Sequence, residues 1–296
     1  MKRPFLKKTL LLISACALFL SSCGNPKPTS SYDANHVKDS IFPDSTNVLP
    51  PIFESDSVIP PISDSSAPSI DADVWDVSDV DISKIDPAKK LISFTFDDSP
   101  SSTIENIFAI FADFNEKNPD CPASATVFFN GLYINANTLH HVHTAHILGF
   151  ELGNHTFSHF DLTTLSEDVL QEEIDKTDDV LFSVDQKRRH LLRAPYGRVD
   201  NFVKERAPAP LIDWTIDTVD WSGVTEESIY NSVINNLSSG AIVLMHDGYT
   251  HTVSALKRLL PDLKELGYQV VSVSQLAKAH NCVLRSGKVY IRAKKH

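Results

Sequence analysis

The sequence is short of several residue types, and each shortage excludes a class of protein. Basic residues are few, because 27 Lys and Arg stand against 38 Asp and Glu, which gives a net charge of −11 and a pI near 5.5. Binding to nucleic acid or another polyanion needs a basic surface, so we expect no nucleic-acid partner. Neutral and cationic substrates are compatible with this charge.

Cysteine is also scarce, with 4 in 296 residues and no Cys-x-x-Cys pair. A thiolate zinc site of the usual spacing is therefore excluded. Cys16 lies inside an N-terminal apolar run, and Cys23 ends it. The other two, Cys121 and Cys282, either form one disulfide in an oxidising compartment or are two buried free thiols.

Residues 1–23 have the order of a bacterial secretion signal. Basic residues are concentrated in the first eight positions, and the apolar run from Leu10 to Leu20 is too short to span a bilayer comfortably. The run ends in Leu20-Ser-Ser-Cys23, which resembles a lipobox, in which the cysteine is lipidated and becomes the mature N-terminus. The alternative is an ordinary signal peptide with a chance cysteine. We expect a lipid anchor at Cys23 that holds the protein on the extracytoplasmic face of a bacterial cell membrane.

Residues 24–85 change composition abruptly. Ser, Pro and Asp dominate, acidic residues outnumber lysines and Arg is missing, so we expect a flexible, anionic linker without a core of its own. Trp75 is the first residue expected to dock on the domain that follows. We predict that this domain covers 86–281 and that 282–296 form a basic C-terminal tail.

The chain is organised around the stretch from Leu91 to Pro100. Its first six residues are apolar, aromatic or β-branched and predict a buried strand. The strand ends in Asp97 and Asp98, and adjacent carboxylates at a buried strand end are costly unless a cation or proton neutralises them. The alternative is an Asx-type turn with both acids solvated.

Strand and helix patterns alternate from this point. Strands are expected over 125–129, 150–152, 190–192, 211–215, 241–245 and 268–273, and helices over 101–117, 137–148, 166–182, 225–238 and 251–266. This alternation predicts a parallel α/β arrangement. Polar residues gather just after the strand ends, where α/β barrels have their active sites.

A pair of histidines follows the third expected strand. His155 and His159 are four apart, and on a helix this spacing puts both imidazoles on one face, where they can meet one ion. With an aspartate from the first strand they form a two-His, one-carboxylate set that leaves positions for water and substrate. One aspartate would then ligate while the other stays free as a base. A second group has no comparable carboxylate partner, and we interpret it as a solvated helix surface: His140, His141, His143 and His146.

Five motifs in order resemble the polysaccharide deacetylase family, the NodB-homology domain of carbohydrate esterase family four. Each motif alone is weak, whereas five at compatible spacing are highly specific, and the resemblance covers the chain from about residue 91 to 276. It implies a distorted, incomplete (β/α) barrel of parallel strands. The motifs are Thr95–Pro100, His155–His159, Arg193–Gly197, Asp217–Trp221 and Leu244–His246.

The resemblance implies a metal centre and a base. Asp97 resembles the family's general base, and Asp98, His155 and His159 resemble its metal ligands. Arg193 would orient the base through a charge-assisted contact. The implied cofactor is one divalent ion, with Zn²⁺ expected and Co²⁺ or Ni²⁺ as alternatives.

The later motifs imply the rest of the site. Tyr196 lies where the family uses a backbone N–H to hold the oxyanion. Asp220 would orient His246, the general acid, while Trp221 would wall the groove and Leu244 would line a pocket for the acetyl methyl group. Core packing is the alternative for Trp221 and Leu244, because apolar residues near strand ends are usually buried.

The sequence departs from the family's pattern at one position beside the aspartates. The family usually has Gly where this chain has Ser99, and Gly permits a positive φ that Ser adopts only at a cost. The segment between the third and fourth motifs also looks short, which predicts an open groove there.

The function that the resemblance implies is hydrolysis of N-acetyl groups on amino sugars of a peptidoglycan-like or chitin-like polysaccharide, with release of acetate. We expect a monomer whose partners are the acetylated polysaccharide and the membrane. One alternative is an O-acetyl esterase acting on acetylated xylan. Another is a glycan-binding lipoprotein with a degenerate site, against which the retention of every matched acid and histidine argues.

Replacing Cys23 tests the predicted anchor. Cys23→Ala should move the protein out of the membrane fraction, because the acyl chain on this residue is the expected attachment. Cell fractionation and mass spectrometry of the mature N-terminus measure both effects. Wild-type protein that is soluble, unmodified and cleaved at another residue would contradict the lipobox.

Overall fold

The computed structural model describes residues 73–294, so the predicted signal peptide, Cys23 and most of the predicted linker lie outside the described residues. One sheet of nine strands organises this part of the chain, in the order β6-β7-β1-β2-β3-β4-β5-β9, with β8 paired to the first half of β1. Every pairing between these strands is parallel. The strands are β1 Lys90–Ser99, β2 Thr126–Phe129, β3 Glu151–Asn154, β4 Leu191–Leu192, β5 Leu211–Ile212, β6 Ile216–Asp217, β7 Ile242–His246, β8 Tyr268–Val271 and β9 Val289–Tyr290.

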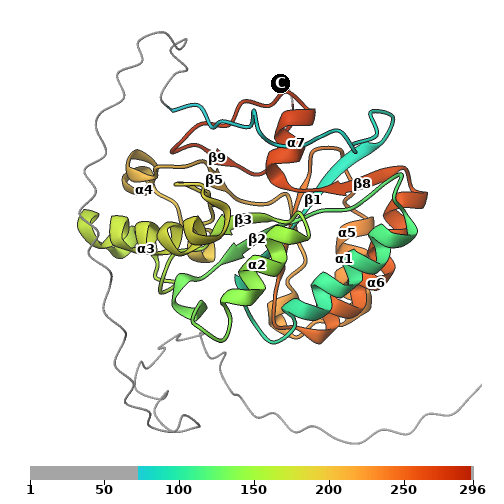
Figure 1. Cartoon of the computed structure of the whole chain (residues 1–296), viewed down its shortest axis with the longest axis horizontal. Coiled ribbons are helices and arrows are strands. Elements are labelled where there is room, and N and C mark those ends of the chain that lie inside the picture. The colour runs from blue at the N-terminus through green and yellow to red at the C-terminus, as the bar shows by residue number, and fades with distance from the viewer. Residues whose placement is uncertain (1–72, 295–296) are drawn as a thin grey trace, which may run out of the picture. The chain divides into compact units, whose positions relative to one another are not determined.

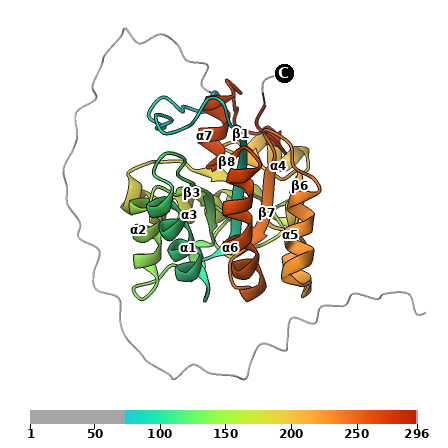
Figure 2. The same ribbon diagram turned by 90° about the vertical axis from the view of Figure 1, so that its right-hand side faces the viewer.

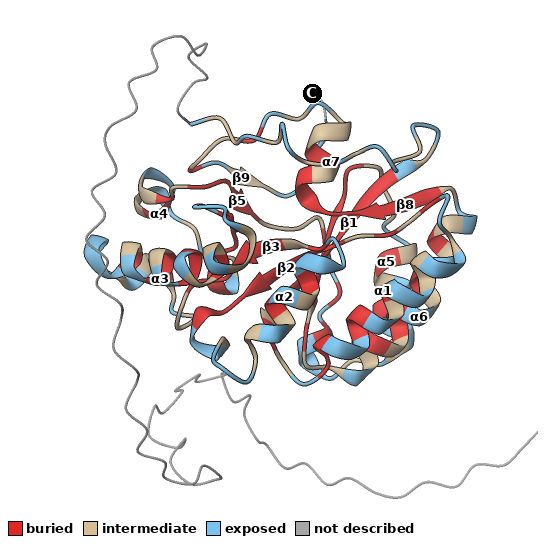
Figure 3. Cartoon of the chain, viewed as in Figure 1, coloured by how far each residue is buried: buried red, intermediate tan, exposed pale blue. Residues whose placement is uncertain are grey.

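Helices pack around the outside of the curled sheet (Figures 1 and 2). Their buried sides face the strands and their exposed sides face solvent, as Figure 3 shows. None of the helices within 73–294 has the length and apolar character needed to cross a membrane. They are α1 Ile104–Lys117, α2 Leu139–Ile147, α3 Glu167–Asp185, α4 Asn201–Arg206, α5 Glu226–Ile234, α6 Thr250–Glu265 and α7 Val273–Ala279.

The central strand β1 is buried on both faces, which explains its nearly continuous apolar sequence. The following helix α1 buries one stripe at helical spacing: Ile104, Ile107, Phe108 and Phe111. Phe111 joins the two elements through an edge-on contact with Phe96, with ring centroids 6.2 Å apart. The predicted strand and the predicted helix face are both confirmed.

The predicted strand over 211–215 is two short strands. β5 pairs with β4 and β9, whereas β6 pairs with β7 at the other end of the sheet. The three residues between them, 213–215, therefore carry the chain from one end of the sheet to the other and curl it into the predicted incomplete barrel. Asp213 N–H donates to Tyr290 O at 2.9 Å on the β9 side, and Thr215 N–H donates to Ile242 O at 2.9 Å on the β7 side.

The C-terminal boundary of the domain lies later than predicted. Residues 282–294 are part of the fold rather than a tail, because they contain β9 and bury Leu284 and Ala293 between their basic residues. Trp75 docks on this segment through its backbone N–H, which donates to Leu284 O at 2.9 Å. Cys121 and Cys282 are both free thiols in the structure.

Helices α4 and α7 were missing from the expected pattern. The start of α7 carries a recognisable signal, a capping box in which Ser272 and Gln275 exchange side-chain and backbone hydrogen bonds. Helix α4 begins after Asp200, whose side chain accepts from Val203 N–H at 2.9 Å. Both helices are under eight residues long, and such short segments give little periodicity to detect.

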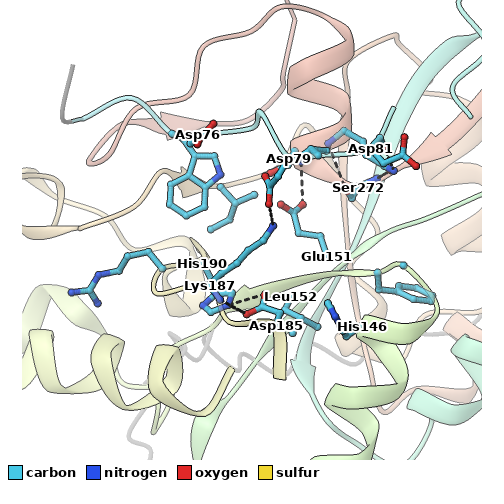
Figure 4. Close-up of a pocket in the computed structure, with 18 of the residues that line it drawn as sticks. Asp76, Asp79, Asp81, His146, Glu151, Leu152, Asp185, Lys187, His190 and Ser272 are labelled. Atoms are coloured by element: carbon cyan, nitrogen blue, oxygen red, sulfur yellow. Dashed lines mark hydrogen bonds and ion pairs between the residues drawn. The ribbon is translucent and has the colours of Figure 1, made fainter. Parts of the chain in front are cut away.

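A cleft of about 810 Å³ lies at the amino ends of β3 and β4, beneath the segment that contains Trp75 (Figure 4). Two ion pairs lie among its charged groups. Lys187 Nζ lies 3.4 Å from Asp79 Oδ2, and His190 Nε2 lies 3.2 Å from Asp185 Oδ2. The contact between Lys187 and Asp79 holds the described end of the predicted linker against the domain. The cleft lies at the edge of the sheet opposite to the carboxyl ends of the strands.

Candidate active site

The predicted site residues meet at the carboxyl edge of the sheet. The parallel register pairs Asp97 of β1 with His246 of β7, so the first and last motifs lie side by side although 149 positions separate them (246 minus 97). On the other flank β2 pairs with β3, whose last residue, Asn154, leads directly into His155.

Three predicted ligands form one cluster of donor atoms. Asp98 Oδ1 lies 3.7 Å from His155 Nε2 and 3.4 Å from His159 Nε2. All three atoms lie within 4.8 Å of one another. Two imidazole nitrogens and one carboxylate oxygen suit a divalent transition metal such as zinc and leave coordination positions open.

The geometry that brings the two histidines together is a loop and not the predicted helix. Residues 155–159 follow β3 without helical hydrogen bonding, and Thr156 and His159 have positive φ values of 65° and 60°. The Asn154 side chain stabilises this turn, because its Oδ1 accepts from Thr156 N–H at 2.8 Å. The structure therefore brings the predicted pair together, but through a loop and not through helical spacing.

The ring of His155 is held in the tautomer that a metal ligand needs. Its Nδ1 lies 2.8 Å from Arg193 O, and because a carbonyl only accepts, Nδ1 carries the proton and Nε2 keeps its lone pair. Burial lowers the pKa of His155 below its ordinary value despite the neighbouring carboxylates, and burial also lowers the pKa of His159. Both rings are therefore neutral near pH 7, which is the form that binds metal.

Asp97 is buried and held by a fully buried arginine. Arg193 Nη1 donates to Asp97 Oδ1 at 2.8 Å and to Thr95 Oγ1 at 2.6 Å. Burial favours a higher pKa for Asp97, but the charges of Arg193, His155 and His246 outweigh it and hold the pKa below its usual range. Asp97 is therefore ionised at neutral pH, with Oδ2 not engaged by the arginine.

Asp98 has a different environment from its neighbour. Its side chain is 40% exposed, and its backbone is left-handed with φ of 62°. Burial, with a contribution from the charge of Asp97, raises the pKa of Asp98 although His155 opposes the shift. A cation among Asp98 and the two histidines would offset the repulsion between the carboxylates, so the donor set fits a metal.

His246 is oriented by a carboxylate, as predicted. Its ring Nδ1 lies 2.7 Å from Asp220 Oδ1, and its backbone N–H donates to Asp220 Oδ2 at 2.8 Å. Thr252 Oγ1 also donates to this carboxylate, at 2.7 Å, and Asp220 is fully buried. Burial alone would lower the pKa of His246, but the hydrogen bond to Asp220 and the nearby carboxylates raise the pKa above 6.5.

Of the remaining predicted residues, Tyr196 lies beside the cluster of donor atoms. Tyr196 is left-handed with φ of 61°, and its exposed ring lies 4.8 Å from the ring of His159. Trp221 is 57% exposed, so it is not a core residue, whereas Leu244 is buried in β7. Gly197 is required where it stands, because it has φ of 63° and a Cβ there would lie 2.9 Å from the Trp214 ring.

The structure also shows a supporting residue that the sequence reasoning missed. Asp247 accepts from Ser101 N–H at 2.6 Å and from Thr103 Oγ1 at 2.7 Å, and so ties β7 to the loop after the aspartates. Ser99 belongs to the same network, since its Oγ lies 3.4 Å from Asp247 Oδ2. The positive φ in this loop belongs to Asp98, so Ser99 is compatible with the turn. The clue to Asp247 in the sequence is its position directly after His246.

The fold and the site together define an α/β barrel with a hydrolase-type centre. A family model described as polysaccharide deacetylase matches residues 84–209. The chain is 34% identical over 191 residues to a bifunctional xylanase/deacetylase of Pseudobutyrivibrio xylanivorans, a match that spans 64% of this chain and 30% of that protein. It is 33% identical over 199 residues to a peptidoglycan-N-acetylglucosamine deacetylase of Bacillus cereus, spanning 64% of this chain and 89% of that protein.

A solved structure described as T48 deacetylase with substrate is also similar, with a TM-score of 0.64 and 26% identity over 70% of this chain and 99% of that one. The chain belongs to the polysaccharide deacetylase family, which confirms the resemblance carried by the five motifs. It spans less than a third of the length of the xylanase/deacetylase and most of the length of the Bacillus cereus protein.

Variants of the two aspartates should differ in how much metal they bind. Asp98→Asn should lose the metal equivalent held at the His155–His159 cluster after dialysis, because an amide is a poorer ligand for a divalent cation than a carboxylate. Asp97→Asn should keep close to one equivalent at the His155–His159 cluster. Elemental analysis of both variants measures this, with circular dichroism as the control for folding. Loss of metal in Asp97→Asn with retention in Asp98→Asn would reverse the assignment.

Proposed function

We propose that the protein is a metal-dependent deacetylase that hydrolyses N-acetyl groups of amino sugars in a bacterial cell-wall polysaccharide. The observation that carries the proposal is that the pairing of β1 with β7 places two groups with oppositely shifted pKa values side by side. Asp97, ionised and held by Arg193, lies beside His246, whose raised pKa favours the protonated ring. A base and an acid next to a metal cluster are the groups that amide hydrolysis needs.

The metal would be held by Asp98, His155 and His159, and we propose Zn²⁺ because imidazole and carboxylate donors suit it. When bound, a divalent ion polarises the acetyl carbonyl and lowers the pKa of a nearby water. His155 is positioned for this by its hydrogen bond to Arg193 O, and His159 by the left-handed turn that ends at it.

The protein's own groups move the protons. Asp97 Oδ2, the oxygen not bound by Arg193, accepts a proton as water attacks the acetyl carbon. His246 Nε2 donates a proton to the amine nitrogen as the carbon–nitrogen bond breaks, while Asp220 keeps Nδ1 protonated and the ring in place. The products are acetate and a free amino sugar, and the acidic charge of the chain is compatible with a cationic product.

Other residues would bind the substrate around these groups. We assign Tyr196 N–H to the oxyanion, Leu244 to the acetyl methyl group and Trp221 to the wall of the groove. The exposure of Trp221 and the burial of Leu244 are compatible with these roles. The lipobox at Cys23 would hold a monomeric protein on the outer face of the membrane, with the acidic segment as a tether.

O-deacetylation of xylan is the second candidate, because one relative is a bifunctional xylanase/deacetylase. The same base, acid and metal would serve an ester. The similarity to a peptidoglycan-N-acetylglucosamine deacetylase over 89% of that protein favours the amide substrate.

Acetate release tests the proposed function directly. The zinc-loaded protein should release acetate from N-acetylglucosamine oligomers or peptidoglycan and much less from acetylated xylan. Asp97→Asn should lower the rate by about 10²- to 10⁴-fold, the usual contribution of an acid–base group. Release from xylan alone would favour the esterase, and no release from any of these substrates would favour the degenerate glycan-binding protein.

The pH profile tests the role of Asp220. Activity requires protonated His246, so kcat/KM should fall as the pH rises through its pKa, which lies above 6.5. Asp220→Asn removes the negative charge that raises this pKa, so the basic limb should move to lower pH. Asp217→Asn, an exposed position in the same motif, is the matched control and should leave the limb in place. A lower rate with an unmoved limb in Asp220→Asn would show a purely structural role.

A further inference from the structure

The histidines interpreted from sequence as a solvated surface do have a carboxylate partner. Glu105 lies in the first turn of α1, and His140 and His141 lie in the first turn of α2. His140 Nε2 is 3.7 Å from Glu105 Oε1, and His141 Nδ1 is 3.9 Å from the same oxygen. The prediction that these histidines lack a partner is therefore wrong for His140 and His141, because α1 and α2 are neighbours in space.

Adjacent residues on a helix point about 100° apart and do not normally converge on one atom. Here the two rings meet because each uses a different nitrogen. His140 reaches Glu105 with Nε2 at the far end of its ring, and His141 with Nδ1 at the near end. The ring centroids are only 3.9 Å apart.

The spacing of these donors resembles that of the catalytic cluster. The carboxylate–imidazole separations are 3.7 and 3.9 Å in this group, against 3.7 and 3.4 Å around Asp98. Bonds of about 2.0 to 2.1 Å in a tetrahedral zinc site put ligand atoms about 3.4 Å apart. The side chains of Glu105 and His140 are 73% and 58% exposed, so small rotamer changes can close the difference.

Hydrogen bonding within the group does not account for this convergence. Separations of 3.7 and 3.9 Å are too long for hydrogen bonds. The two nitrogens and the oxygen lie within 4.8 Å of one another, so one cation could bind all three. Two imidazoles with one carboxylate select zinc or a similar transition metal over Mg²⁺ and Ca²⁺, which prefer all-oxygen sites.

We propose that Glu105, His140 and His141 form a second divalent-metal site, separate from the catalytic cluster and suited to Zn²⁺. It shares no residue with the catalytic set. Both helices begin after the carboxyl ends of their strands, so the two sites lie on the same side of the sheet. A metal here would join the first turn of α1 to the first turn of α2 and leave a coordination position for water.

Zinc stoichiometry of the full chain tests the proposal. Metal-free protein is dialysed against buffered Zn²⁺ and analysed for zinc per chain. Wild type should hold one equivalent more than Glu105→Gln or His141→Ala, and each variant should bind the second ion at least about 10-fold more weakly. His143→Ala is the matched control, because His143 is exposed on the same helix outside the cluster and its loss should change nothing.

A second pair of variants separates this proposal from the proposed function. The double variant His155→Ala/His159→Ala should lose the catalytic equivalent and keep the one that depends on Glu105. If wild type and the Glu105→Gln/His141→Ala double variant bind equal amounts of zinc, the second site is overturned even when the catalytic site is filled. If zinc binding depends only on Glu105 and His141, the second site stands and the catalytic assignment fails.

Discussion

The buried guanidinium of Arg193 is the group on which the site depends. Arg193 donates to Asp97 at 2.8 Å, and its backbone carbonyl accepts from the ring of His155 at 2.8 Å, so one residue positions both the proposed base and a proposed metal ligand. Its Nε also donates to Ile212 O at 2.8 Å, where the chain begins to cross from β5 to β6. Removing one partner of such a buried pair leaves an uncompensated charge, which typically costs about 3 to 5 kcal/mol. Barrel curvature and site geometry are therefore coupled through this residue.

The two adjacent aspartates show how environment divides roles between identical side chains. Asp97 is enclosed by cationic and hydrogen-bonding groups that stabilise its charge, and it points to Arg193. Asp98, in a left-handed turn one residue later, is partly exposed and points to both histidines. Both carboxylates lie near His155, since Asp97 Oδ2 is 3.6 Å and Asp98 Oδ1 is 3.7 Å from its Nε2, but the change of backbone conformation brings Asp97 to Arg193 and Asp98 to His159. This difference in surroundings is why we propose Asp97 as the base and Asp98 as the ligand.

Support for the site comes from residues outside the five motifs. Asp247 ties the loop after Asp98 to β7, and Asn154 stabilises the turn that brings His155 and His159 together. Asn154 is in turn bound to Asp178 of α3, with Nδ2 2.9 Å from Oδ1. The carboxyl edge of the sheet thus has a second set of polar contacts beneath the reactive groups, and these restrict the motion of the ligands.

The sequence alone indicated the parallel α/β alternation and the family, but not helices α4 and α7 or strand β9. Apolar periodicity predicted β1, the buried face of α1 and the alternation that makes a parallel sheet, because these patterns depend on burial over a few consecutive residues. The resemblance of five ordered motifs identified the family and predicted Asp98, His155 and His159, which the structure brings into one cluster. The expected strands stop at residues 96 and 245, whereas Asp97 lies within β1 and His246 is the last residue of β7.

Only the tertiary structure decided what depends on contacts between distant segments. The loop around His155 takes its shape from Asn154 and two left-handed residues and not from helical spacing. The C-terminal residues join the domain because β9 completes the edge beside β5. Glu105 meets His140 and His141 because α1 and α2 pack side by side, and local periodicity carries no information about which side chains of two helices converge.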